Sequence, residues 1–239
     1  MIIKTASRYE NKFIITNTQK EEMCKFLSNY MAYDKYCLND NMYTIYNIYL
    51  DTEHYDLIID SLLKPKYKEK MRIRSYTWPL KDSDSVYLEI KKKYFGKTNK
   101  RRISCNYAEL KNYLLTGVEP SFDDYINKQI FKEIKYIFSK SQLHLRFAIA
   151  YDRIAFTSKK YGKMRITFDH NIRSQKIDGN KEKINLLDAD KWIMEIKAEN
   201  NYPLWLVKKL PDLQIYPHSF SKYGEVYKNY KKSGEVKCY

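Results

Sequence analysis

The sequence predicts an α+β protein in which eight antiparallel strands close into a barrel, with the helices packed outside. Three observations lead to this prediction. About eight strand-like segments occur in pairs that are separated by helical segments. Most of these strands have one apolar face, and on at least six of them the other face is charged. Closing the sheet would place the charged faces inside a polar tunnel and the apolar faces under the helices.

The length and charge of the chain limit its class. With 239 residues and no Pro-, Gly- or Ser-rich linker, residues 1–239 are predicted to form a single domain. The formal net charge of +15 indicates an anionic partner. Scattered cysteines without a CxxC motif argue against a zinc site or a disulfide framework. No apolar run reaches the ~18 residues of a membrane helix. We therefore expect a cytoplasmic protein, for which any membrane partner would be a separate chain.

The first part of the chain predicts alternating strands and helices. Residues 7–16 alternate as a strand, and Thr18 with Glu21 predicts a capping box for a helix over about 19–31. Residues 43–51, rich in Tyr and Ile, predict a buried strand.

A second helix and a hairpin follow. Thr52 is predicted to cap the helix, and Pro65 to end it. After the strand that contains 69–76, residues 86–94 and 100–105 predict two paired strands.

The remaining segments predict four helices and three strands. Asn106 and Glu109 begin a helix that runs to about 115, and the next helix runs from about 123 to 139. The core side of this second helix is predicted to carry Ile126, Ile130, Ile134 and Ile137. Strands are predicted over 145–156, 163–169 and 192–198, a short helix from Pro203 to about 210, and a last helix capped by Ser219 or Ser221.

Two arginines share one face of the strand over 69–76. Arg72 and Arg74 point to one side, and Met71 and Ile73 point to the other. Neighbouring guanidinium groups repel each other unless a polyanion lies between them, and the planar fork of arginine suits phosphate oxygens. By itself this strand therefore predicts either a phosphate-binding face or an ordinary solvated face, since exposed charges usually need no further explanation.

The same alternation on the other strands gives a set of inward-facing residues with nine cations and three carboxylates. A cavity of this kind could bind a chain of phosphates, with Mg²⁺ or Mn²⁺ on the carboxylates. We expect repulsion among the surplus cations when the cavity is empty. The set is Glu10, Lys12, Arg72, Arg74, Glu89, Lys91, Lys93, Arg153, Arg165, Glu195, Lys197 and Lys222.

Seven short motifs follow one another along the chain, from residue 8 to about 227. They are Arg8-x-Glu10-x-Lys12, Arg72-x-Arg74, Glu89-x-Lys91, Tyr151-x-Arg153, Arg165-Ile-Thr-Phe-Asp169, Glu195-x-Lys197 and Ser219-Phe-Ser-Lys222. Each motif alone is weak, but their order is specific. In this order they resemble the motifs of the VTC (vacuolar transporter chaperone) catalytic domain, which belongs to the triphosphate tunnel metalloenzymes or CYTH superfamily.

The resemblance implies an ATP-dependent polyphosphate polymerase, a phosphotransferase that moves the γ-phosphate of ATP onto a growing chain. Its partners would be ATP and inorganic polyphosphate rather than nucleic acid, and its metal would be Mn²⁺ or Mg²⁺ held by Glu195. Such chemistry depends on positioning and charge neutralisation rather than on a protein nucleophile. The implied catalytic residues are Lys12, Arg72, Arg74, Lys91, Arg153, Arg165 and Lys197. The implied substrate-binding residues are Glu10, Glu89, Lys93, Tyr151, Ser221 and Lys222.

Two other functions stay open from the sequence. The hydrolase branch of the superfamily typically has Glu-x-Glu-x-Lys near its N-terminus, and Arg8 at the first position here favours the polymerase. A non-enzymatic binder of polyphosphate or nucleic acid would not need carboxylates on its phosphate-facing side. Ser219 stands where the family often has Lys, which weakens the tail motif. A further basic cluster is interpreted as a solvated hairpin, or else as a guide for product: Lys97, Lys100, Arg101 and Arg102.

Overall fold

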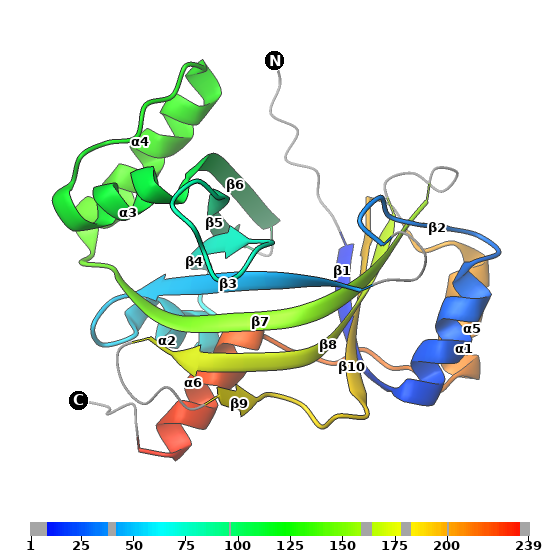
Figure 1. The fold of residues 1–239 in the computed structure, drawn as a ribbon. Helices are drawn as coiled ribbons and strands as arrows, with labels where there is room; N and C mark the ends of the chain where they lie inside the picture. Colours follow the sequence, from blue (N-terminus) through cyan, green and yellow to red (C-terminus); the bar gives the residue numbers. More distant parts are fainter. Residues whose placement is uncertain are drawn as a thin grey trace. The chain divides into compact units, whose positions relative to one another are not determined.

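The computed structural model describes residues 9–37, 42–95, 97–158, 164–177, 183–199 and 201–234 (Figure 1). Arg8 and Lys163 lie outside these residues. The strands are β1 (Tyr9–Thr16), β2 (Ala32–Tyr33), β3 (Tyr43–Asp51), β4 (Tyr67–Ser75), β5 (Ser85–Tyr94), β6 (Lys97–Asn106), β7 (His144–Thr157), β8 (Arg165–Lys176), β9 (Lys183–Asn185) and β10 (Lys191–Ala198). The helices are α1 (Asn17–Leu27), α2 (Asp56–Leu62), α3 (Tyr107–Thr116), α4 (Tyr125–Lys140), α5 (Leu204–Asp212) and α6 (Lys222–Lys232).

The α+β class is confirmed, but the closed eight-stranded barrel is not. Ten described strands form one sheet in the order β1-β10-β8-β7-β3-β4-β5-β6, and β2 and β9 pair with β7 and β8. Among the described residues β1 and β6 end this path without pairing to each other. The registered pairs are antiparallel, as expected. The additional strands β2 and β9 are two and three residues long, too short to show an alternating pattern.

The chain groups into two compact units. Unit 1 comprises Met1–Thr44, Ala150–Arg173 and Ile184–Glu225, and unit 2 comprises Ile45–Ile149, Ser174–Lys183 and Val226–Tyr239. Strands β7 and β8 contribute residues to both units. Each unit has its own core, and the single domain that the sequence suggests stays a prediction.

Unit 1 buries the apolar faces of β1, β8 and β10 against α1 and α5. Phe13 of β1, Phe168 of β8 and Met194 of β10 are almost completely buried in one cluster with Met23 of α1 and Leu206 of α5. Figure 1 shows α1 and α5 side by side. In agreement, the ring centres of Phe26 in α1 and Trp205 in α5 lie 5.8 Å apart. The charged alternate positions of the strands are thereby directed to the opposite face of the sheet.

Helix α1 begins two residues earlier than the sequence suggested. Thr16 is the N-cap, and it forms the capping box with Gln19 instead of the predicted pair Thr18 and Glu21. Both pairs fit the same motif, but Thr16 keeps an extended backbone because it is the last residue of β1. The strand end therefore determines which of the two pairs acts as the cap.

Unit 2 buries the apolar faces of β4, β5 and β6 against α3 and α4. The predicted capping box of Asn106 and Glu109 begins α3. In α4, Ile130, Ile134 and Ile137 are buried, as predicted. Ile126 is 52% exposed, contrary to the prediction, because the first turn of α4 lies beyond the core.

The predicted cap of α2 is partly correct. The hydroxyl of Thr52 accepts a hydrogen bond from the N–H of Asp56, the first helical residue. The buried carboxylate of Asp51 accepts two further bonds, from Leu57 and Ile58. The N-cap position itself is Tyr55, in a left-handed conformation. Among the described residues, no helix is long and apolar enough to cross a membrane.

We predict that Ile134→Ala lowers the free energy of unfolding of the protein by about 2–5 kcal/mol, since Ile134 is fully buried and its removal leaves a cavity. The matched control is Ile126→Ala in the same helix, which should change this free energy by no more than about 0.5 kcal/mol. Urea denaturation followed by circular dichroism measures both. Equal losses in the two variants would contradict the packing of α4 described here.

Candidate functional site

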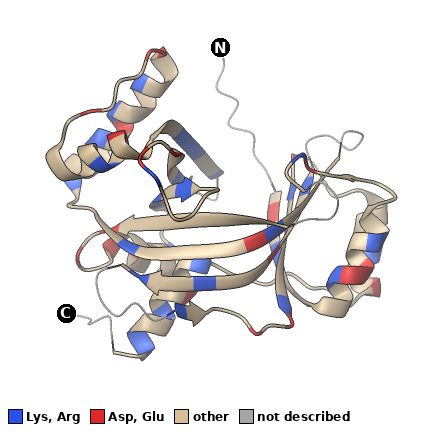
Figure 2. Cartoon of the chain, viewed as in Figure 1, with Lys and Arg blue, Asp and Glu red and all other residues tan. Residues whose placement is uncertain are grey.

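Four consecutive rows of side chains cross β4, β5 and β6 on the face opposite the core of unit 2. We call this surface the basic face (Figure 2). Among the described residues it carries eight cations and one carboxylate. The rows are Arg74, Tyr87 and Ser104; Arg72, Glu89 and Arg102; Lys70, Lys91 and Lys100; and Lys68, Lys93 and Thr98.

Glu89 is the centre of the basic face. Its side chain is 1% exposed and lies 2.7 Å from Nη2 of Arg72, 2.6 Å from Nζ of Lys100 and 3.9 Å from Nε of Arg74. Burial by itself raises the pKa of Glu89, but the charges of Arg72, Arg74 and Lys100 lower it to about 2. The ionised carboxylate therefore holds three cations close together.

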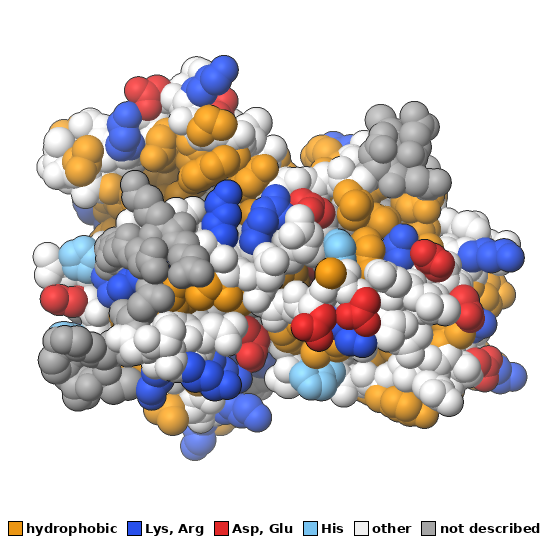
Figure 3. Space-filling model, turned by 60° about the horizontal axis from the view of Figure 1, so that its bottom comes forward, with side chains coloured by type: hydrophobic (Ala, Val, Ile, Leu, Met, Phe, Trp, Pro, Cys, Tyr) orange, Lys and Arg blue, Asp and Glu red, His pale blue; other side chains and the backbone are white. Residues whose placement is uncertain are grey.

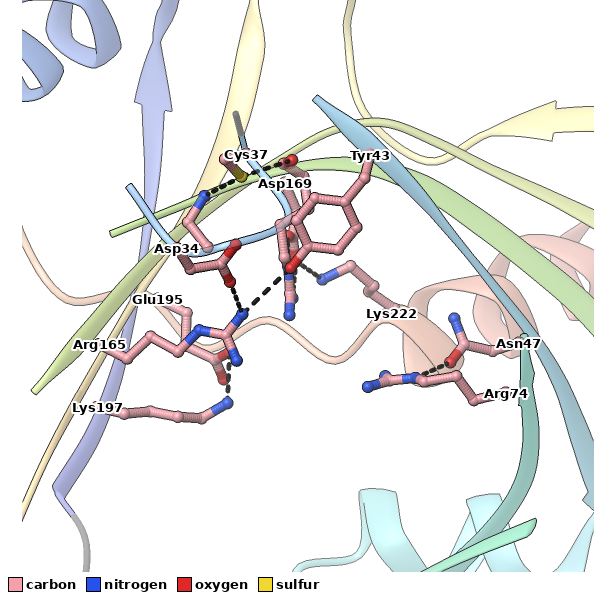
Figure 4. A network of polar contacts seen from close by, with 12 residues as sticks. Asp34, Cys37, Tyr43, Asn47, Arg74, Arg165, Asp169, Glu195, Lys197 and Lys222 are labelled. Atoms are coloured by element: carbon pink, nitrogen blue, oxygen red, sulfur yellow. Dashed lines mark hydrogen bonds and ion pairs between the residues drawn. The ribbon is translucent and has the colours of Figure 1, made fainter. Parts of the chain in front are cut away.

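The two predicted arginines are further fixed from β3. Nε of Arg74 donates to Oδ1 of Asn47 at 3.1 Å (Figure 4). Nη1 of Arg72 donates to the hydroxyl of Tyr49 at 3.2 Å. The side chains of Arg72 and Arg74 are 23% and 10% exposed, so neither is completely covered.

The lysines of the basic face are crowded. Lys91 and Lys93 are exposed. Burial lowers the pKa of Lys68, and the charges of Lys93, Lys64 and Lys91 lower it further. This is the repulsion that a bound anion would relieve.

Lys100 also belongs to the site, so its interpretation as part of a solvated hairpin is only partly correct. Its side chain is 40% exposed, and its Nζ lies 2.6 Å from Glu89. Partial burial lowers the pKa of Lys100, against the attraction of Glu89, and the charge of Arg72 lowers it further. Arg101 points to the opposite face and pairs with Glu133 of α4. The alternation within 97–106 could have separated the two residues, because Lys100 pairs in register with Lys91.

Unit 1 presents a second charged surface, formed by β1, β10, β8 and β7 with Lys222 and Asp34. We call it the mixed face because it has five cations and four carboxylates among the described residues. Its members are Glu10, Lys12, Asp34, Tyr151, Arg153, Arg165, Thr167, Asp169, Glu195, Lys197 and Lys222.

Asp169 anchors the mixed face, and the sequence analysis did not assign it a role. This fully buried carboxylate accepts two bonds from Arg153, at 2.6 and 2.8 Å, and one from Lys222. Arg153 and Lys222 both lie over the ring of Tyr151. Burial raises the pKa of Asp169, but Arg153 and Lys222 lower it to about 2. Two of the predicted phosphate ligands are thus held by a carboxylate that is as buried as they are.

Arg165 is also paired with an acidic group that the sequence analysis missed. Its Nη2 lies 2.6 Å from Asp34 and 3.1 Å from the hydroxyl of Tyr43 (Figure 4). Its buried Nε has no hydrogen-bond partner in the described part of the chain. Asp34 lies 131 residues away in sequence, so no local pattern could have identified the pair.

Glu195 occupies the middle of the mixed face. It pairs with Lys197 at 2.9 Å, and its direct cross-strand neighbours are Lys12 and Thr167. Burial raises the pKa of Glu195, but the charges of Lys197 and Lys12 hold it well below its usual value. Glu195 is therefore ionised.

The oxygen donors around Glu195 fit a small divalent cation. Glu10 lies opposite Lys197 in register, two residues from the pair Lys12 and Glu195 on the same strands. The buried hydroxyl of Thr167 has no hydrogen-bond partner among the described residues. Mg²⁺ and Mn²⁺ are typically held by one or two carboxylates together with substrate phosphates. The described residues contain no group of three or more His, Cys, Asp or Glu side chains that could hold a metal ion.

The tail residues lie next to this surface. Nζ of Lys12 donates to the carbonyl of Phe220 at 2.8 Å. Ser221, and not Ser219, caps α6, because its hydroxyl accepts from the N–H of Gly224. Lys222 is the first residue of the helix and is turned towards Asp169.

The expected repulsion among unpaired cations is only partly correct. On the mixed face, Arg153, Arg165, Lys197 and Lys222 each have an acidic partner. The surplus charge is concentrated on the basic face. On the outer surface drawn in Figure 3, basic side chains are instead interspersed with acidic and apolar ones.

We predict that Asp169→Asn lowers the free energy of unfolding by about 3–5 kcal/mol at neutral pH, because Arg153 and Lys222 then lose their charged partner. The folded pKa of Asp169, about 2, lies below the ordinary value of 3.8. Its stabilisation is therefore complete above pH 3.8 and is lost as the pH falls towards 2.

The wild type should accordingly lose more stability between pH 4 and pH 2 than the variant. Chemical denaturation at several pH values measures this difference. Asp82→Asn, at an exposed ion pair with Lys111, is the control and should behave as the wild type. Parallel pH profiles for wild type and Asp169→Asn would refute the role of Asp169.

Comparison with known proteins gives a family match, a similar curated protein and similar solved structures. The model of the VTC domain matches residues 7–230. Vacuolar transporter chaperone complex subunit 2 of Saccharomyces cerevisiae is 27% identical over 169 residues, which covers 62% of this chain and 20% of the yeast protein. The chain thus spans about a fifth of the length of that relative.

Among solved structures, a Bacillus halodurans protein described as a candidate adenylate cyclase superposes with a TM-score of 0.55. It is 13% identical, and the match covers 90% of this chain and 95% of the other. At this identity the likeness concerns the fold alone. The family match extends over nearly the whole chain and confirms the resemblance that the ordered motifs indicated. The chain belongs to the VTC domain family.

Proposed function

We propose that this protein is an ATP-dependent polyphosphate polymerase, which transfers the γ-phosphate of ATP onto a growing polyphosphate chain. The observation that carries the proposal is the charge of the basic face, where eight cations surround one carboxylate in four successive rows. Concentrating so many cations on one surface costs free energy unless a polyanion binds there. Membership of the VTC domain family supports the same assignment.

The geometry of the basic face suits a linear chain of phosphates. Same-face residues of a strand recur about every 7 Å, so the rows offer cations at regular intervals. Arg72 and Arg74 present planar forks for phosphate oxygens, while Lys91 and Lys93 offer exposed ammonium groups. In this proposal the main role of Glu89 and Lys100 is to hold Arg72 and Arg74 in position, rather than to bind phosphate.

In this proposal the mixed face holds the metal ion that the reaction requires. Glu195, with Glu10 and Thr167, would hold Mn²⁺ or Mg²⁺ together with phosphate oxygens. When bound, the ion neutralises charge that develops on the phosphoryl group. Lys12, Arg165 and Lys197 surround these donors and would contact the phosphates. Arg153 and Lys222 are held by Asp169, so their positions are fixed before substrate binds.

The reaction requires no protein nucleophile. A terminal oxygen of the polyphosphate chain attacks the γ-phosphorus of ATP, the bond to the β-phosphate oxygen breaks, and ADP leaves. The chain gains one phosphate for each ADP released. If water attacked in its place, the products would be ADP and orthophosphate, which is the hydrolase alternative.

We predict that the purified protein, supplied with ATP and Mn²⁺ or Mg²⁺, produces ADP together with a polymer that an exopolyphosphatase degrades. Glu195→Gln should abolish turnover while nucleotide binding persists through the cations of the basic face. Glu133→Gln is the matched control, since this glutamate pairs with Lys92 and Arg101 on the opposite face of the sheet.

Gel electrophoresis of the polymer and an ADP assay measure the products. Orthophosphate without polymer would favour the hydrolase. Full activity of Glu195→Gln would show that Glu195 is not an essential metal ligand.

We also predict that Arg72→Gln weakens the binding of inorganic tripolyphosphate by roughly tenfold or more, because a charge-assisted contact is lost. The matched control is Arg101→Gln, on the opposite face of the same three strands and equally exposed. It should bind tripolyphosphate like the wild type. Isothermal titration calorimetry at fixed ionic strength measures both, and equal weakening would show that only net charge matters.

A further inference from the structure

One end of the basic face is aromatic. Tyr87 is the cross-strand partner of Arg74 and shares its row with Ser104. Tyr76 follows β4 two residues after Arg74, and its ring lies 6.1 Å from that of Tyr87, edge to face. The guanidinium carbon of Arg102 lies 4.7 Å from the centre of the Tyr87 ring.

These rings are accessible. Tyr76 is 46% exposed, and Tyr87 is half-buried. An aromatic ring at the surface beside a guanidinium group can offer its π-face to a planar ligand. Stacking of bases on aromatic side chains tolerates different bases, because each base has a π-face of its own.

The order of side chains along the basic face matches the order of groups in a nucleotide. From this end the rows run from tyrosines through Arg74 and Arg72 to Lys70, Lys91 and finally Lys68 with Lys93. Successive rows are about 7 Å apart. A base at the aromatic end would therefore place its phosphates over the arginines.

We propose that Tyr76 and Tyr87, backed by Arg102, form a base-stacking site for the nucleoside end of a nucleoside triphosphate. The nucleotide would lie along β4 and β5, with its phosphates directed towards Lys68 and Lys93. The inference rests on the proposed function, which it deepens by giving the donor nucleotide a direction. It also means that the protein distinguishes ATP from inorganic tripolyphosphate, although both carry three phosphates.

Calorimetric titration of the full chain with β,γ-imido-ATP and with inorganic tripolyphosphate tests the proposal. Tyr76→Ala should weaken binding of the nucleotide roughly tenfold, the loss of one stacked base, and leave tripolyphosphate binding unchanged. Tyr76→Phe keeps the ring and should bind both ligands like the wild type. Tyr94→Ala is the matched control, because this tyrosine is 59% exposed and lies on β5, the strand of Tyr87, but on the opposite face of that strand.

The outcomes separate the two proposals. Two results would overturn the stacking site while leaving a phosphate-binding function intact. In the first, Tyr76→Ala does not affect nucleotide binding. In the second, it weakens nucleotide binding and tripolyphosphate binding in parallel. A wild type that binds neither ligand would overturn the proposed function and the stacking site together. Selective loss of nucleotide binding in Tyr76→Ala, with no loss in Tyr76→Phe and Tyr94→Ala, would establish the site.

Discussion

Two buried carboxylates, one in each unit, hold the cations of the charged strand faces in place. Glu89 in unit 2 gathers Arg72, Arg74 and Lys100, and Asp169 in unit 1 gathers Arg153 and Lys222. A buried carboxylate is tolerated only when paired and hydrogen-bonded, and a buried cation has the same requirement. The surrounding structure therefore depends on complete ion clusters, and the positions of the cations are set without any ligand.

The mixed face and the basic face differ in how much positive charge is left without an acidic partner among the described residues. On the mixed face nearly every cation has an acidic partner, so the surface offers carboxylate and hydroxyl oxygens as well as positive charge. On the basic face a single carboxylate serves many cations, and Lys68 experiences their mutual repulsion. The first arrangement suits a metal ion that arrives with phosphate, and the second suits a polyanion.

Strand alternation made much of the fold and the site predictable. Period-two patterns located β1 and β4 to within about two residues and identified Arg72, Arg74, Glu89 and Glu195 as members of charged faces, while a Tyr- and Ile-rich composition located β3. In 97–106 the same alternation places Lys100 on the basic face, where it pairs with Glu89 although its side chain is 40% exposed. Asp34 has no such pattern, since it lies outside the long strands and meets Arg165 only in the folded chain.

The sequence by itself determined the class of the protein, the positions of its main strands and helices, and which face of each strand is charged, because these depend on local periodicity and capping. The tertiary structure decided which charges become partners. It also decided which strands end the sheet, and that Thr16, as the last residue of β1, caps α1. These features depend on contacts between residues far apart in the chain. The free energies of such contacts cannot be inferred from a local sequence pattern.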